Sequence, residues 1–349
     1  MKCMLLVFAL CFVPPAVAQN KPASPKKSVL VTTQRKNELL GNLLKDKKLN
    51  PDYIRMVFDD TRLTVYEPPP PAPPSPPGPA PRRRVNPYLT ERFGLLTDVS
   101  FERCRTFYRD HQETMDAAHD IFGVPKEVIC GILRIETNFG IPTKLSPSPF
   151  GSRPIVNSLY SMYVRRPLVC QGSGSKRKCA PMPQAQFTRR QQFALGEMRH
   201  LFSFVERLQW DPFSIPGSPT GAFGLPQFQP SSFPVAIDGN GDGDIDLFNP
   251  HDAVMSVANY LVSRGWDKNK SHQDRAIARY YGIRKGERYQ DSHYMIAIRK
   301  YEERTKKYFD ANPIVEEFVF VPEPISLTED EKAFLGSYQP IETTHEPAQ

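Results

Sequence analysis

One helical stretch organises the middle of the chain: Lys126-Glu127-Val128-Ile129-Cys130-Gly131-Ile132-Leu133-Arg134-Ile135-Glu136-Thr137. Four of its side chains share one face of an α-helix: Ile129, Ile132, Leu133 and Glu136. Pro125 precedes the stretch and suits a first helical turn, and Gly140 is expected to stop the helix. The pattern predicts a helix with an apolar face in the core and a carboxylate near its end.

Glu136 lies on the face that the apolar residues direct into the core. Burial of an ionised carboxylate is expensive, so such a group either finds a partner or raises its pKa. A glutamate of raised pKa is what a general acid for a glycosidic oxygen requires. The alternative is a structural glutamate paired with a neighbouring arginine such as Arg134, and the spacing alone favours this alternative.

Helical patterns also dominate the rest of the globular segment, residues 86–310. Further helices are expected at Phe101–Phe122, Ala253–Val262, Asp274–Tyr281 and Tyr294–Tyr308. Few stretches alternate as strands do, so the sequence predicts an α+β fold that is mainly α. The chain of 349 residues is long enough for two domains, or for one with appendages.

The N-terminal segment indicates the compartment. Residues 1–18 combine a basic start, an apolar stretch and the small-residue pattern Ala16-Val17-Ala18, which predicts a signal peptide cleaved before Gln19. An uncleaved anchor is the alternative. A lipoprotein is not expected, because Leu10 stands before Cys11 where lipid attachment needs a small residue.

Two segments of different composition precede the globular part. Residues 19–67 are polar and show helical apolar spacing at 37–45 and 51–58. Residues 68–85 form a proline-rich linker, for which we expect extended polyproline II. This linker is also a candidate docking site for a protein partner.

Charge and hydropathy limit the class of protein. No apolar run approaches the roughly 20 residues needed to span a bilayer, which excludes a polytopic membrane protein. The net charge of +7 and the pI near 9.0 favour an anionic partner, of which nucleic acid is one candidate. Residues 311–349 form an acidic, proline-punctuated C-terminal tail with one strand-like run at 317–321.

Four cysteines remain after the expected signal cleavage, and an exported chain permits two disulfides. Cys170 and Cys179 flank a Gly/Ser/Lys-rich segment and predict a stapled surface hairpin, which leaves Cys104 and Cys130 as the second pair. Four cysteines allow three pairings, however, and Cys130 could instead be a buried free thiol. A zinc or redox site is poorly supported, because no CxxC pair occurs.

A calcium-type loop reads Asp238-Gly239-Asn240-Gly241-Asp242-Gly243-Asp244. Oxygen ligands at alternate positions, with glycine at the sixth, suit Ca²⁺. The twelfth position is Asn249 instead of a glutamate, and Asp252 could close a longer loop. The alternative is an acidic turn without metal, but the agreement of residue types and spacing favours a metal.

A glycine-punctuated segment, Ser218–Ser232, precedes this loop. Its first half is too rich in glycine and proline for a helix, and it lacks the lysine of a phosphate-binding loop. The exposed backbone, Gln227 and the nearby serines could hydrogen-bond a sugar. Taken alone, the segment could equally be an ordinary structural loop.

Three motifs occur in one order: Glu136–Gly140, Gly221–Ser232, and the Asp238 loop running into Asp252–Tyr260. This series closely resembles the B-type lytic murein transglycosylases, exported enzymes that cleave bacterial cell-wall glycan. The resemblance covers Tyr88–Tyr308. It implies a lysozyme-like catalytic core with a calcium-type loop and helical N-terminal additions, in the periplasm of a Gram-negative bacterium.

The resemblance implies that Glu136 is a single general acid and base. It would protonate the oxygen of the bond between N-acetylmuramic acid (MurNAc) and N-acetylglucosamine (GlcNAc). It would then activate the MurNAc C6 hydroxyl, which attacks C1 and leaves a 1,6-anhydroMurNAc end. The motifs offer no second carboxylate, unlike the usual two-carboxylate glycosidase. The alternatives are a hydrolytic muramidase, which would need that carboxylate, and a calcium-stabilised wall-binding protein without catalysis.

By matching position, four residues would line the glycan groove: Ser218, Gln227, Tyr260 and Tyr280. Tyr281 stands where the family pattern has asparagine, and Tyr88 matches an upstream groove tyrosine at a different spacing. Five residues would hold a structural Ca²⁺: Asp238, Asn240, Asp242, Asp244 through its carbonyl, and Asp252. The implied partner is the peptidoglycan glycan strand, whose peptide carboxylates suit a basic protein without any nucleic acid, and a monomer is expected.

Overall fold

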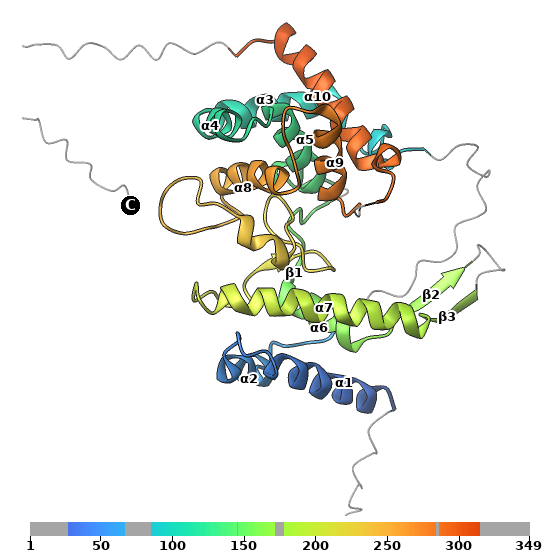
Figure 1. The fold of residues 1–349 in the computed structure, drawn as a ribbon. Helices are drawn as coiled ribbons and strands as arrows, with labels where there is room; N and C mark the ends of the chain where they lie inside the picture. The colour runs from blue at the N-terminus through green and yellow to red at the C-terminus, as the bar shows by residue number, and fades with distance from the viewer. Residues whose placement is uncertain (1–26, 67–84, 145, 172–177, 284–285, 315–349) are drawn as a thin grey trace, which may run out of the picture. The chain divides into compact units, whose positions relative to one another are not determined.

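The computed structural model describes residues 27–66, 85–144, 146–171, 178–283 and 286–314. The expected signal peptide, the proline-rich linker up to residue 84 and the strand-like run of the tail lie outside these residues. Figure 1 shows the helices: α1 (Lys27–Leu44), α2 (Pro51–Asp59), α3 (Asp98–Asp110), α4 (Gln112–Phe122), α5 (Lys126–Glu136), α6 (Ile155–Val164), α7 (Gln184–Val205), α8 (Pro250–Ser263), α9 (Lys270–Tyr280) and α10 (His293–Ala311).

Strands in the described ranges form two short antiparallel pairs. β1 (Arg153–Pro154) pairs with β4 (Pro216–Gly217), and β2 (Leu168–Gln171) pairs with β3 (Lys178–Pro181). The predicted fold class, mainly α with minor β, is confirmed. None of the helices in these ranges combines the length and the apolarity that crossing a membrane requires.

Most predicted helices are confirmed, with ends set by caps that apolar spacing does not show. The helices α8 and α9 begin a few residues before the predicted starts, because the side chains of Asn249 and Asn269 accept hydrogen bonds from the first turns. The N-terminal helical stretches correspond to α1 and α2. The long helix predicted at Phe101–Phe122 is wrong, because the chain breaks at His111 into α3 and α4.

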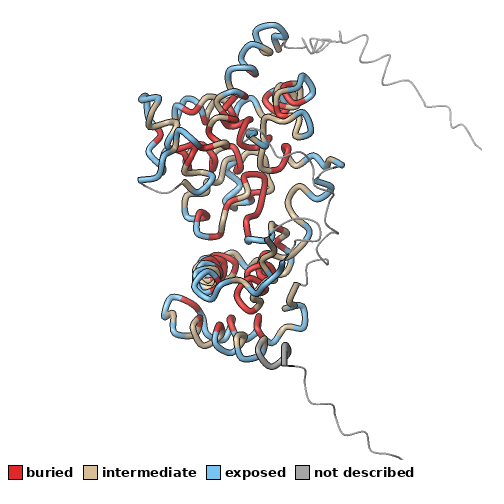
Figure 2. The backbone as a smooth tube through the Cα atoms, turned by 90° about the vertical axis from the view of Figure 1, so that its right-hand side faces the viewer, coloured by how far each residue is buried: buried red, intermediate tan, exposed pale blue. Residues whose placement is uncertain are grey.

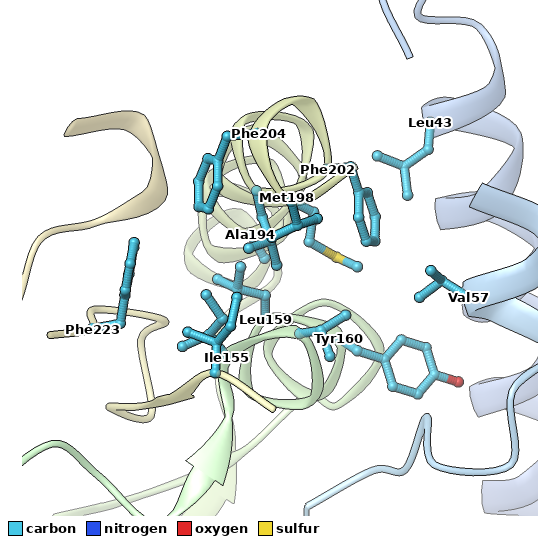
Figure 3. Close-up of a cluster of buried hydrophobic side chains, with 14 of the residues drawn as sticks. Leu43, Val57, Ile155, Leu159, Tyr160, Ala194, Met198, Phe202, Phe204 and Phe223 are labelled. Atoms are coloured by element: carbon cyan, nitrogen blue, oxygen red, sulfur yellow. The ribbon is translucent and has the colours of Figure 1, made fainter. Parts of the chain in front are cut away.

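The helices α6 and α7 pack against each other, and the sequence analysis predicted neither of them. Figure 3 shows how α7 joins two regions of the core: Phe202 points toward Leu43 and Val57 of the N-terminal helices, whereas Phe204 points toward Phe223. The Phe204 ring also stacks on Phe233 at a centroid distance of 4.1 Å. The N-terminal helices and the glycine-punctuated segment therefore share one hydrophobic core.

A separate group of helices packs around α5, which contacts α3, α4, α8 and α10. In Figure 2, residues coloured as buried gather in the interior of this group of helices. Gly131 allows the approach of α10, because a Cβ atom there would lie 3.1 Å from the Tyr301 ring. This packing fixes the end of α5, and with it Glu136, against α10.

Both predicted disulfides are confirmed. Cys104–Cys130 joins α3 to α5, and Cys170–Cys179 links the facing strands β2 and β3. The alternative in which Cys130 is a free thiol is wrong.

Candidate active site

Glu136 is the last residue of α5, and its side chain is largely withdrawn from solvent. The predicted apolar face is fully buried beside it, at Ile129, Ile132 and Leu133. The hydroxyl of Tyr294, at the start of α10, donates a hydrogen bond of 2.7 Å to Glu136 Oε1. One carboxyl oxygen is thus held by a phenol from a different helix.

The environment of Glu136 favours its protonated form. Burial raises the pKa of the Glu136 carboxyl to about 7, and the hydrogen bond from Tyr294 opposes part of that rise. Among the described residues no other carboxylate or cation contributes to this pKa. The carboxyl is therefore close to half protonated at neutral pH, as a general acid requires.

The alternative in which Glu136 pairs with Arg134 is not found. Arg134 turns its guanidinium toward the other side of α5, where it donates to Ser100 Oγ at 2.8 Å and to the Gly94 carbonyl at 3.1 Å. In the part of the chain that the structure describes, no ion pair joins it to Glu136. The carboxyl is left with a phenol as its hydrogen-bond partner.

Tyrosines from four parts of the chain gather around this carboxyl. Tyr294 is fully buried, and its ring lies parallel to that of Tyr280 at 6.1 Å. Tyr260 meets Tyr280 edge-on at 4.9 Å, and Tyr88 meets Tyr294 edge-on at 5.8 Å. Burial and the nearby Glu136 charge raise the pKa of Tyr280 well above its usual range, so its phenol stays neutral.

The structure thus places Tyr260, Tyr280 and Tyr88 in one cluster with Glu136, although Tyr88 lies 48 residues before Glu136 in the sequence and Tyr260 and Tyr280 lie more than 100 residues after it. The sequence analysis missed Tyr294. Its only signal was the start of a predicted helix, which does not show that the hydroxyl reaches another element.

The glycine-punctuated segment is tied to this cluster through its backbone carbonyls. Thr137 Oγ1 donates to the Leu225 carbonyl at 2.9 Å, and the Tyr280 hydroxyl donates to the Pro226 carbonyl at 2.7 Å. Gln227 adopts a positive φ of 49°, and its Nε2 donates to the Gly224 carbonyl at 3.0 Å. Gln227 is therefore held at the cluster in a sparsely populated backbone conformation.

Ser218 lies at the other end of this segment. Its Oγ accepts hydrogen bonds from the amides of Thr220 and Ala222, at 3.3 and 3.0 Å. Within the described residues no hydrogen bond joins Ser218 to Glu136 or to the tyrosines. The structure gives this serine a role in the turn of the segment.

The calcium-type loop contains carboxylate oxygens that could bind a metal ion. Those of Asp238 and Asp252 accept hydrogen bonds from backbone amides of the loop. The Asp238 carboxylate accepts from the amides of Gly241 and Gly243, at 2.7 and 2.8 Å. Asp252 accepts from the Gly239 and Asp246 amides, at 2.8 and 2.6 Å.

The donor chemistry of this loop fits Ca²⁺, which prefers oxygen ligands. Burial, and further the negative charges of Asp238 and Asp242, raise the pKa of Asp252, and a bound cation would offset this repulsion. In the described ranges, however, no three acidic, histidine or cysteine side chains come together as a metal group. Asp244 is exposed, as suits a ligand that acts through its carbonyl.

Comparisons with known proteins identify the family of the chain. Residues 34–308 match the family described as Transglycosylase SLT domain. Over 182 residues the chain is 30% identical to membrane-bound lytic murein transglycosylase B of Escherichia coli (strain K12). That match covers 52% of this chain and 43% of the relative, so the chain spans less than half the length of the curated relative that it matches.

Solved structures share the fold. SltB1 of Pseudomonas aeruginosa, a soluble lytic transglycosylase, matches with a TM-score of 0.57 and 20% identity over 79% of this chain and 99% of that chain. The Escherichia coli lytic transglycosylase SLT35 in complex with calcium matches with a TM-score of 0.56 and 18% identity over 78% and 93%. SltB3 of Pseudomonas aeruginosa in complex with NAG-anhNAM-pentapeptide matches at 0.55 and 16%, over 79% of each chain. The expected lysozyme-like fold class is thereby confirmed.

Proposed function

Because the chain belongs to the transglycosylase SLT domain family, we propose that it is a lytic transglycosylase that cleaves the MurNAc-β-1,4-GlcNAc bond of peptidoglycan. The observation that carries the proposal is the Glu136 carboxyl, with a pKa raised to about 7 and a tyrosine hydroxyl as its hydrogen-bond partner. A single carboxyl that is ready to donate a proton at neutral pH, in a family of transglycosylases, favours this reaction.

In the proposed mechanism, protonated Glu136 donates its proton to the glycosidic oxygen, and the bond between that oxygen and MurNAc C1 breaks. The carboxylate then takes the proton of the MurNAc C6 hydroxyl, whose oxygen attacks C1 and closes the 1,6-anhydro ring. The proton that Glu136 gave to the leaving sugar is thus recovered, and no water is consumed. Tyr294 holds Oε1 during both steps and leaves Oε2 toward the substrate.

The environment of Glu136 favours this route over hydrolysis. A glycosidase that uses water or a covalent intermediate needs a second carboxylate near the acid. Within the described residues, burial and Tyr294 account for the pKa of Glu136, and no carboxylate charge adds to it. The relative SltB3 is described in complex with a ligand that carries an anhydro-MurNAc group, which is the product of such a reaction.

We place the glycan strand along the tyrosine cluster and the glycine-punctuated segment. Tyr260 and Tyr280 are proposed to contact the sugars, since they belong to the tyrosine cluster at Glu136. Gln227 is proposed to do the same, because it follows Pro226, whose carbonyl accepts a hydrogen bond from Tyr280. Ser218 is proposed to lie further along the groove, at the start of the segment. The net charge of +7 suits a polymer that carries peptide carboxylates.

A bound Ca²⁺ is part of the proposal as a structural ion. Asp238, Asn240, Asp242, the Asp244 carbonyl and Asp252 would hold it. The ion would neutralise the carboxylates of the loop and stabilise the native state, to which alone it would bind. It would take no part in the chemistry at Glu136.

The proposed site of action is the bacterial cell envelope. The curated relative is named as membrane-bound and as acting on murein. We propose that this chain is exported through its N-terminal signal, acts in the periplasm as a monomer, and offers its proline-rich linker to a protein partner.

Digestion of purified peptidoglycan with the signal-free protein tests the function, with the soluble fragments weighed by mass spectrometry. Fragments one water lighter than hydrolysis products are expected from the wild type. None are expected from Glu136→Gln, whose fold is checked by circular dichroism. Fragments of full hydrolytic mass would establish a muramidase. Turnover by the folded variant would remove Glu136 from the mechanism, and no fragments from calcium-loaded wild type would indicate a wall-binding protein.

A further inference from the structure

Tyr281 is an exposed aromatic residue next to the buried tyrosine cluster. It caps the C-terminal end of α9, directly after Tyr280, and 61% of its surface is accessible to solvent. Tyr294, by contrast, is fully buried.

The ring of Tyr281 ends a stack that leads to the catalytic carboxyl. It lies 5.2 Å from the Tyr294 ring, with an angle of 14° between the planes. The Tyr294 ring also lies parallel to the Tyr280 ring, with a centroid distance of 6.1 Å and an angle of 6° between the planes. The Tyr281 ring is therefore one ring spacing from the phenol that donates to Glu136.

Tyr88 fixes the orientation of this outer ring. The rings of Tyr88 and Tyr281 meet edge-on at 6.1 Å, with an angle of 89°. Burial and, after it, a hydrogen bond with Tyr281 raise the pKa of the Tyr88 phenol. A tyrosine that is held on one face and one edge, yet remains largely exposed, presents its other face to solvent in a fixed orientation.

We propose that Tyr281 is a sugar-binding platform of the active site, where the open face of its ring stacks on a pyranose ring of the glycan strand held at Glu136. This inference rests on the proposed function for the identity of the polymer. The flat face of a pyranose presents C–H groups of slight positive charge, which match the negative face of an aromatic ring. Fixing the ring in advance reduces the entropy lost on binding.

The platform supplies an aromatic contact to the sugar. Stacking on a ring depends on shape and not on a particular hydroxyl. The contact is therefore expected to set the affinity for sugar rings and to leave proton transfer by Glu136 unchanged.

The test measures sugar affinity and chemistry separately. An N-acetylglucosamine trimer is titrated calorimetrically into the catalytically inactive Glu136→Gln protein and into the double variant that also carries Tyr281→Ala. We expect about tenfold weaker binding without the ring, the change that corresponds to about 1.4 kcal/mol. Tyr281→Phe keeps the ring and is expected to bind like the parent. Tyr289→Ala, a nearby tyrosine that contacts Arg275, is the matched control and should also bind normally.

Kinetics on soluble, uncross-linked glycan strands complete the test. For Tyr281→Ala we expect a rise in KM of about tenfold, with an unchanged pH profile for kcat, and rescue by Tyr281→Phe. If Tyr281 only covers Tyr294, its loss would move the pH profile and leave trimer affinity intact, which overturns the platform. Equal affinity in all variants overturns it as well. An inactive wild type whose trimer binding still depends on Tyr281 would refute the proposed function and leave the platform standing.

Discussion

Replacing Glu136 with glutamine is expected to stabilise the folded protein at alkaline pH. Burial raises the pKa of the carboxyl from 4.5 to about 7, so the folded state resists ionisation that the unfolded state accepts. Below pH 4.5 the group is protonated in both states, so it does not lower the free energy of unfolding. Above that pH its burial carries a penalty in this free energy. The penalty grows between pH 4.5 and 7, and above pH 7 the folded protein bears all of it.

The size of the penalty follows from the two pKa values. At about 1.4 kcal/mol for each pH unit between them, it amounts to about 3 kcal/mol at pH 8 and about 1 kcal/mol at pH 5. The amide of glutamine stays neutral and its oxygen can still accept the hydrogen bond from Tyr294. The variant is therefore expected to exceed the wild type in free energy of unfolding by about these amounts.

Urea denaturation at pH 5 and pH 8, followed by circular dichroism, measures the difference. Glu136→Asp is the matched control, because it keeps a carboxyl in the same buried region, one methylene closer to the backbone, and should retain a pH dependence of the same sign as the wild type. A difference in free energy of unfolding between wild type and Glu136→Gln that is the same at both pH values would refute the reasoning. It would mean that the carboxyl is solvated in the folded protein.

Three further predictions concern other parts of the molecule. Tyr294→Phe removes a hydrogen bond that favours ionised Glu136, so the alkaline limb of the rate profile should move up by about one pH unit, and an unmoved limb would contradict the contact. Chelation should lower the melting temperature, by an amount equivalent to about 2.7 kcal/mol at a hundredfold excess of Ca²⁺ over its Kd. Asp238→Asn should lose this response. Identical melting temperatures with and without chelator would show that calcium does not stabilise the wild type. Replacing Cys104 and Cys130 together by alanine should lower the free energy of unfolding by about 3 kcal/mol in urea, because the disulfide closes a long loop; no loss would mean that the pair stays reduced.

Local spacing was enough to predict α5 and the helices α8 to α10. Their apolar residues recur on one face, so the signal for each helix lies within the segment itself, whereas the starts of α8 and α9 depend on the caps Asn249 and Asn269. The helix α6 was missed for the opposite reason. Nearly all of its residues are buried, so no polar face sets a period that a sequence pattern can show.

The break at His111 also depends on packing. Apolar residues continue at helical spacing through this position, which predicted one long helix. In the structure α3 packs on α5 and α10, while α4 packs chiefly on α8. Two partners in different directions require a change of axis that the local sequence does not encode.

The sequence by itself determined which residue carries the carboxyl, the order of the three motifs and the helical character of the chain, because each depends on residues that are neighbours along the chain. Only the tertiary structure decided that Arg134 turns away from Glu136 and that Tyr294, 158 residues later, donates to it. The pKa of a buried group depends on everything within a few ångströms, whichever part of the chain supplies it. That neighbourhood forms when α10 packs on α5, and it turns a glutamate at the end of a helix into a candidate acid.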